Sequence, residues 1–381
     1  MSTVVVLAFK TGEIGIWADT MVTRKAPVGP IAGRTTQGEA FQPISTKDGV
    51  LYFDEGACKI GAFGDKTICA ITTDNSDFAI ELIVRVEKRL FDPISLPNIH
   101  HDFHFALVDM SGKVGNPGFA QYIIATEVSE GRCFFLLEAS RNDKGECFLN
   151  HGEKLVVKGE EWGDIFGSGK AYLDNINKSG LASVTQFYYQ DSSAQKIFPF
   201  LVATNISNWL KISTNNSAAG VGGAFLGHLL TDKGIITTPE AMHVVADPSS
   251  EIKVFCKHVY SDSVFTVHDL VSRHLMKFET LDGAMKRWNN AAADLTKNDE
   301  IAMHFSSPFI AVDKRSEEDP DAPNVSIVEN QEGKNAMHGP HFESDAVVYP
   351  LPEEPISFTP SNGIKLTLKM SKYIPRESGK P

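Results

Sequence analysis

The chain has 381 residues, of which 42% are hydrophobic and 22% are charged, the composition of a globular protein. Its formal net charge of −12 argues against a general electrostatic attraction to nucleic acid or to an anionic membrane surface. No stretch approaches the roughly 18 uncharged apolar residues of a transmembrane helix. The first residues also lack a basic segment followed by an apolar core, so they do not fit a signal peptide.

The cysteines are few and dispersed, with no CxxC pair: Cys58, Cys69, Cys133, Cys147 and Cys256. An odd, scattered set favours buried thiols in a reducing compartment over a disulfide framework or a zinc site. We therefore expect a cytoplasmic protein.

The first elements form a predicted hairpin. Residues 3–9 are an apolar, largely β-branched run, residues 10–13 form a turn around Gly12, and a second apolar run over 14–18 ends at Asp19. Residues 20–48 show little periodicity and read as a long loop, and strands are expected over 58–63 and 67–71. Helix-capping residues at 73–76 then precede a helix with apolar residues at helical spacing over 77–91.

The middle of the chain predicts more strands and two more helices. Short apolar runs separated by turn sequences predict antiparallel hairpins over 103–108, 120–126, 133–138, 146–149 and 154–158. A helix is expected after Ser168-Gly169 and another over 194–212, followed by strands over 221–230, 234–237, 242–245 and 252–259. This order predicts an α+β protein, with helices packed outside antiparallel sheets rather than in βαβ units.

The character of the sequence changes near residue 266. We expect one domain over 1–265 and a C-terminal extension of unknown role over 266–381. The extension is predicted to begin with a helix-rich piece over 267–295. An acidic, proline-containing stretch over 313–324 and two strands over 346–349 and 364–370 follow.

The hydroxyl residues at the amino terminus are candidate nucleophiles. Removal of Met1 before the small Ser2 would expose a residue whose hydroxyl attacks while its own α-amine, with a pKa of about 8, takes the proton. Such a site needs a cation beside the amine, a carboxylate to hold the cation, and N–H donors for the oxyanion. Asp19, Lys59 and the glycine-flanked Ser168 are candidates for these roles, and this chemistry requires no metal or organic cofactor.

Four sequence blocks, in conserved order over residues 2–260, resemble proteasome β-type subunits and bacterial HslV. They are the opening hairpin that ends in Ala-Asp, CKIGAFGDKTICAITTDNSDFAIEL, IFGSGKAY and VGGAFLGHLLTDKGI. The resemblance implies the N-terminal nucleophile (Ntn) hydrolase fold, a four-layer αββα sandwich, and assembly into a ring- or spiral-shaped homo-oligomer. It also implies that Asp19, Lys59 and Ser168 match the acidic residue, the essential lysine and the serine of the family's site.

The nucleophile is either Ser2 or Thr3. In the resembling family, the nucleophile precedes the turn and the acidic residue by a set number of residues. The spacing from Asp19 favours Thr3, whereas the spacing from the turn at Gly12 favours Ser2. A β-bulge at Gly15 would reconcile the two counts, and we therefore expect Ser2, since Thr3 would require the loss of a second residue.

The implied function is hydrolysis of peptide or amide bonds, with an ATP-dependent unfoldase as a partner by analogy alone and with no nucleic acid or membrane partner. A catalytically silent structural or binding protein is the first alternative, because Ala218 and Val221 stand where active relatives carry Asp and Ser. The second is a small-molecule amidase, whose pocket the insertion over 20–58 would cover.

The histidines at His100, His101 and His104 raise the question of a metal site. On the strand expected there, neighbouring side chains would point to opposite faces, and no downstream Cys or His spacing completes a ligand set. The sequence therefore favours a site without a metal.

Overall fold

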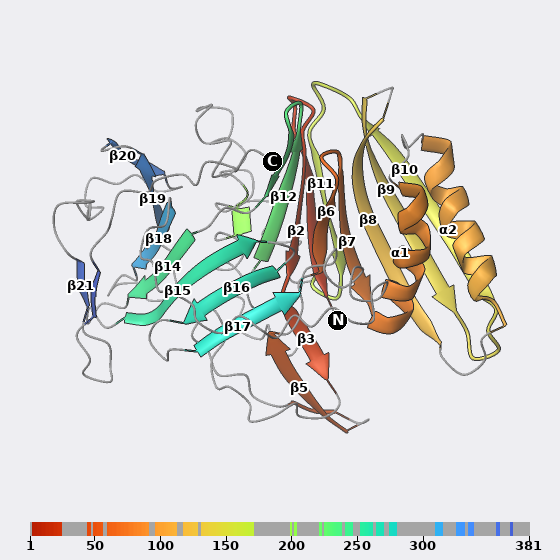
Figure 1. Cartoon of the computed structure of the whole chain (residues 1–381), viewed down its shortest axis with the longest axis horizontal. Helices are drawn as coiled ribbons and strands as arrows, with labels where there is room; N and C mark the ends of the chain where they lie inside the picture. Colours follow the sequence, from red (N-terminus) through yellow and green to blue (C-terminus); the bar gives the residue numbers. More distant parts are fainter. Residues whose placement is uncertain are drawn as a thin grey trace, which may run out of the picture.

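The computed structural model describes the larger part of the first 237 residues and further β-strands beyond them. The described residues are 2–24, 44–46, 49–55, 59–90, 96–112, 117–128, 131–170, 199, 202–203, 221–222, 225–237, 241–246, 252–261, 264–269, 274–279, 309–314, 325–331, 334–338, 356–358 and 366–368. They form a mixed structure in which two helices accompany two five-stranded antiparallel sheets (Figure 1). The predicted α+β class is confirmed at this level.

The first sheet is built around the amino-terminal hairpin. Its strands follow the order β11-β1-β2-β12-β13, with the bounds β1 Thr3–Ala8, β2 Ile14–Asp19, β11 Trp162–Gly167, β12 Phe225–Thr231 and β13 Gly234–Thr237. The β1–β2 register is continuous, with Val4 opposite Ala18 and Leu7 opposite Gly15. The bulge expected at Gly15 is therefore wrong: each residue of one strand has its partner on the other.

The second sheet is a meander of longer strands. Its order is β10-β9-β8-β7-β6, with the bounds β6 Ile60–Phe63, β7 Thr67–Thr73, β8 Gly118–Val128, β9 Gly131–Arg141 and β10 Cys147–Val156. The two strands predicted over 146–149 and 154–158 are one continuous strand, β10. Because one face of this sheet meets the first sheet and the other meets helices, most side chains of β7 and β8 are buried on both faces.

Two helices, α1 (Ser76–Leu90) and α2 (Leu96–Met110), cover the outer face of the second sheet (Figure 1). The predicted start of α1 is confirmed, because the Asn75 side-chain oxygen caps it by accepting a hydrogen bond from the Phe78 N–H at 3.1 Å.

The strand expected over 103–108 is wrong, because these residues belong to the helix α2. Buried residues recur there every three or four positions, at Ile99, Phe103, Ala106 and Met110, which is the period of a helix. Neither helix in the described part of the chain is long and apolar enough to cross a membrane.

One hydrophobic core lies between the two sheets. Val4, Val6 and Ile16 of the first sheet pack with Ile68 and Ile123 of the second, and all are fully buried. A further core joins the second sheet to the helices: Phe103 of α2 packs on the Tyr122 ring, and the Tyr122 hydroxyl donates to the Ala79 carbonyl of α1 at 2.6 Å. The layers are therefore helix, sheet, sheet.

The remaining face of the first sheet carries Trp17, a fully buried residue. Two strand glycines make room for its ring, since a Cβ added at Gly15 or Gly227 would lie 2.0 Å or 1.9 Å from ring atoms. The indole N–H donates to the Pro199 carbonyl at 3.0 Å, and Val202 nearby in the chain is fully buried. Pro199 thus lies against the edge of the Trp17 ring.

Additional strands lie where the sequence predicted other structure. Part of the long loop expected over 20–48 belongs to a three-stranded sheet of β3 (Met21–Arg24), β4 (Ile44–Thr46) and β5 (Gly49–Glu55). The helix expected over 267–295 is wrong where it can be compared, because β16 (Val264–Asp269) and β17 (His274–Glu279) are paired strands.

A seven-stranded sheet combines these two strands with five others, β14 (Ala241–Ala246), β15 (Ile252–Ser261), β18 (Phe309–Lys314), β19 (Val325–Gln331) and β20 (Lys334–His338). A two-stranded sheet pairs β21 (Ile356–Phe358) with β22 (Leu366–Leu368). The expected boundary between residues 265 and 266 falls inside β16, and the division into two domains stays a prediction. The strand expected over 346–349 and most of both later helices lie outside the described residues.

The contact between Trp17 and Gly227 predicts a specific effect on stability. Gly227→Ala should lower the free energy of unfolding by about 3 kcal/mol, because the new methyl group overlaps the indole in a closed core. Gly152→Ala in β10 is the matched control, since nothing lies within 4 Å of its added Cβ, and it should change stability by less than about 0.5 kcal/mol. Urea unfolding of both variants tests this, and equal effects would contradict the packing described.

Candidate active site

Asp19 is a fully buried carboxylate bound by three nitrogen donors. Its Oδ1 accepts from the Thr3 backbone N–H at 2.9 Å and from the Lys59 ammonium at 2.7 Å. Its Oδ2 accepts from the backbone N–H of Gly222 at 3.3 Å. One carboxylate therefore joins residues that are far apart in the sequence.

The strand registers explain why these groups meet. Because Val4 lies opposite Ala18, the first residue of β1, Thr3, lies beside the last residue of β2, Asp19. Lys59 directly precedes β6 of the other sheet, where its carbonyl accepts from the Ile71 N–H at 2.9 Å. Its ammonium also donates to the Met21 carbonyl, so Lys59 ties the second sheet to both ends of the β2–β3 connection.

Burial sets the electrostatics of this centre. Removal from water raises the pKa of the Asp19 carboxyl, and the Lys59 ammonium opposes this effect together with the N–H donors of Thr3 and Gly222. The Lys59 side chain is itself only 10% exposed. Each charge of the pair would be costly to bury alone, so the two residues depend on each other.

The hydroxyl of Thr3 lies in a tight, closed environment. Thr3 is fully buried, and its Oγ1 has no hydrogen-bond partner. A Cβ added at Gly169 would lie 2.0 Å from this oxygen, so the backbone at Gly169 packs directly on the hydroxyl. A buried hydroxyl without a hydrogen-bond partner destabilises the folded state. Such unpaired polar groups are found at catalytic positions.

Ser168 binds the carbonyl oxygen of Ser2 through two donors. The Ser168 backbone N–H lies 2.9 Å from this oxygen, and the Ser168 Oγ lies 3.3 Å from it. Gly167 adopts a positive φ of 83°, and a Cβ there would lie 2.1 Å from the same oxygen. The Gly-Ser-Gly turn at the end of β11 therefore wraps the Ser2 carbonyl and polarises it.

The structure brings all five sequence-predicted residues into one cluster: Ser2, Thr3, Asp19, Lys59 and Ser168. Their catalytic roles stay predictions. The continuous hairpin register makes Thr3, and not Ser2, the neighbour of Asp19.

Four further members of the cluster were not predicted as site residues, namely Met21, Gly167, Gly169 and Gly222. They contribute backbone atoms or close packing, which side-chain chemistry does not reveal. The available signals were the glycines that flank Ser168 and the Gly222-Gly223 pair in the later strand block. Val221 beside it is fully buried, and Ala218 lies outside the described residues.

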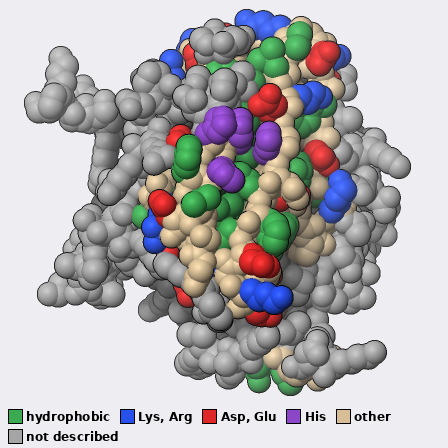
Figure 2. Space-filling view, turned by 90° about the vertical axis from the view of Figure 1, so that its right-hand side faces the viewer, with side chains coloured by type: hydrophobic (Ala, Val, Ile, Leu, Met, Phe, Trp, Pro, Cys, Tyr) green, Lys and Arg blue, Asp and Glu red, His purple; other side chains and the backbone are tan. Residues whose placement is uncertain are grey.

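The histidines form a separate patch on the helical face (Figure 2). The rings of His100 and His101 on α2 lie 4.2 Å apart, and His151 of β10 stacks on His100 at 4.5 Å. Desolvation lowers the pKa of His100, and the neighbouring His101 and His151 lower it further. Within the described residues, no three His, Cys, Asp or Glu side chains are arranged to hold a metal ion.

No protein-family model matches this chain. A search of curated proteins also finds no match. The resemblance to proteasome β-type subunits and HslV therefore depends on the four sequence blocks, and the site must be interpreted from its own geometry.

The mutual dependence of Asp19 and Lys59 predicts a stability effect. Asp19→Asn or Lys59→Met alone should each lower the free energy of unfolding by about 3–5 kcal/mol, because each leaves a buried charge without its partner. The double variant should lose less than the sum of the two, which urea unfolding can measure as a coupling energy.

The matched control is Arg85→Gln, which breaks the more exposed i,i+4 pair between Arg85 and Glu81 of α1. It should cost less than about 1 kcal/mol. Additive effects of the two buried substitutions would contradict a direct pair.

Proposed function

We propose that this protein is an Ntn hydrolase that cleaves peptide or amide bonds, with Thr3 rather than Ser2 as its nucleophile. The observation that carries the proposal is the shared oxygen of Asp19, which holds both the Thr3 backbone nitrogen and the Lys59 ammonium. A lysine fixed beside the nitrogen of a hydroxyl residue is the arrangement that such a nucleophile needs.

The first reaction would act on the chain itself. The Thr3 hydroxyl would attack the Ser2 carbonyl carbon, while the backbone N–H and hydroxyl of Ser168 stabilise the developing oxyanion. Cleavage of the C–N bond passes the proton to the Thr3 nitrogen and leaves Ser2 as an ester on the Thr3 oxygen. Water then hydrolyses this ester, which releases Met1-Ser2 with a free carboxylate and leaves Thr3 with a free amine.

The same groups would then act on a substrate. The Thr3 amine accepts the proton of its own hydroxyl as that oxygen attacks the substrate carbonyl, and it returns the proton to the leaving amine. The Lys59 ammonium favours the neutral amine and the charged oxygen, and Asp19 fixes the position of Lys59. Water completes the cycle by hydrolysing the ester.

The proposal includes the four-layer αββα sandwich of this class. The helix–sheet–sheet layers and the contact of Pro199 with the Trp17 ring support it, because the second helical layer belongs on the Trp17 face. Assembly into a homo-oligomer, a cytoplasmic location and an unfoldase partner are implied by the resemblance, and they belong to the same proposal.

A catalytically silent relative is the second candidate. The observation in its favour is the full burial of Thr3 under Gly169, together with Val221 at a position where active relatives carry Ser. In this alternative, the Asp19–Lys59 pair only stabilises the junction of the two sheets.

Intact mass of the purified protein, before and after treatment with a β-lactone electrophile, tests the proposal. We expect loss of Met1-Ser2 and one adduct on Thr3. Thr3→Ala should retain residues 1–2 and take no adduct, Thr3→Ser should still react, and the control Ser2→Ala should behave as the native chain. An adduct on Ser2 would overturn the choice of nucleophile, and an intact amino terminus without an adduct would favour the silent candidate.

A further inference from the structure

A cavity of about 520 Å³ lies at the opposite end of the first sheet from Thr3. Its wall includes Gly12 in the β1–β2 turn, Arg132 at the start of β9, Asp232 in the β12–β13 turn and Lys158 just after β10. The six residues of β1 separate it from Thr3 by roughly 20 Å, at about 3.3 Å per residue. The cavity is therefore independent of the cluster around Asp19.

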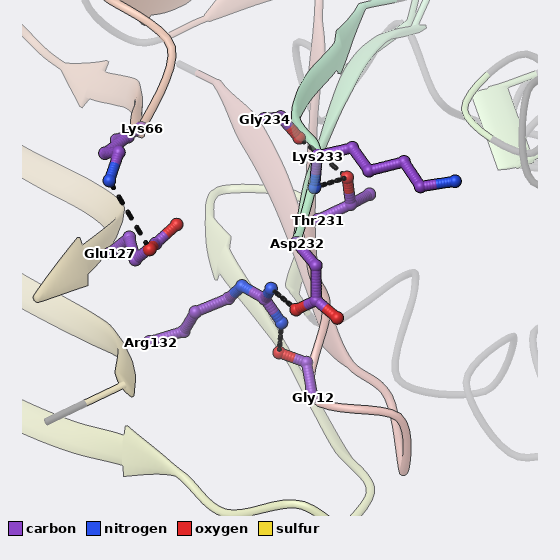
Figure 3. A network of polar contacts seen from close by, with 8 residues as sticks. All are labelled: Gly12, Lys66, Glu127, Arg132, Thr231, Asp232, Lys233 and Gly234. Atoms are coloured by element: carbon purple, nitrogen blue, oxygen red, sulfur yellow. Dashed lines mark hydrogen bonds and ion pairs between the residues drawn. The ribbon is translucent and has the colours of Figure 1, made fainter.

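Arg132 is the central group of this wall, and its side chain is only 8% exposed. One of its terminal nitrogens donates to the Gly12 carbonyl at 2.7 Å, and the other pairs with one carboxylate oxygen of Asp232 (Figure 3). The third nitrogen, Nε, is buried without a hydrogen-bond partner. Asp232 therefore binds only Nη2 of the guanidinium edge formed by Nη2 and Nε. Such an edge can bind a carboxylate through two parallel hydrogen bonds.

The charges around the cavity are compatible with an anionic ligand. Glu127 in the wall is offset by Lys66 at 3.5 Å, and Asp232 is offset by Arg132 (Figure 3). Lys158 also lines the cavity and, after Arg132, helps to lower the pKa of Asp232, so two cations act on this one carboxylate. The Asp232 side chain is 67% exposed, so water can take over its solvation if another carboxylate replaces it.

The rest of the wall is apolar and accessible. Leu155 and Val157 are 43% and 49% exposed, although large apolar side chains usually lose such exposure on folding. Val128 and Val156 line the same space. The volume lies within the roughly 300–1,000 Å³ of small-molecule sites, which combine apolar walls with a few polar groups.

We propose that this cavity binds an aliphatic monocarboxylate. The ligand carboxylate displaces Asp232 from Arg132, pairs with the Nη2–Nε edge and lies near Lys158, while the aliphatic chain packs on Leu155 and Val157. The proposal does not depend on the hydrolase function, because none of these residues belongs to the cluster around Asp19.

Titration of the full-length protein with hexanoate tests the ligand class, with hexan-1-ol as the neutral isostere. Binding is followed by calorimetry and by backbone NMR shifts. We expect saturable hexanoate binding that shifts the amides of Gly131, Arg132 and Lys158, and no binding of hexan-1-ol. Equal binding of the two probes, no binding of hexanoate, or shifts confined to other regions would overturn the proposal.

Three variants test the displacement of Asp232. Asp232→Asn should strengthen hexanoate binding by about tenfold, because it removes the competing carboxylate, and a misfolded protein would not show such a gain. Lys158→Gln should weaken binding by about threefold or more. The matched control is Lys233→Gln, which removes a charge beside Asp232 from a side chain that points away from Arg132 (Figure 3), and it should leave the affinity unchanged. Weaker binding to Asp232→Asn would overturn the proposed displacement.

Discussion

The burial of the Asp19 carboxylate is the constraint on which the site depends. A charge in this position must be paired and hydrogen-bonded, and the chain supplies a lysine and two backbone N–H groups for it. Those donors come from β1, from Lys59 just before β6 and from Gly222. The carboxylate therefore fixes the amino terminus, joins the two sheets and positions the only lysine of the cluster.

Glycines that let the backbone pack closely against other groups are the second feature on which the structure depends. Gly167 and Gly169 allow the turn after β11 to lie on the Ser2 carbonyl and on the Thr3 hydroxyl, where any Cβ would collide. Gly15 and Gly227 do the same for Trp17 on the neighbouring strands. In both places the absence of a side chain lets a larger or more reactive group be enclosed without strain.

The local patterns of the sequence predicted much of the ordered part. The apolar runs that form β1 and β2, the turn at Gly12 and the capped start of α1 are local features, and they were predicted correctly because local chemistry determines them. The five candidate residues lie in one cluster, as the four sequence blocks implied, and their catalytic roles stay predictions. The helix α2 was missed because the run over 103–108 is too short to separate a strand from a buried helix face.

Long-range features were not predictable in the same way. The choice between Ser2 and Thr3 depends on the register of a hairpin, which a one-residue slip would change completely. The role of Gly222 depends on a backbone N–H, which every residue except proline has. The end of β16 and all of β17 were predicted as helix, because partners elsewhere in a sheet decide such segments more than their intrinsic propensity does.

A crystal structure of the purified full-length protein tests the central claim most directly. We expect a chain that begins at Thr3, with the Lys59 ammonium within hydrogen-bond distance of both Asp19 Oδ1 and Thr3 Oγ1. A chain that still carries Met1 and Ser2, with Lys59 turned away from Asp19, would contradict it.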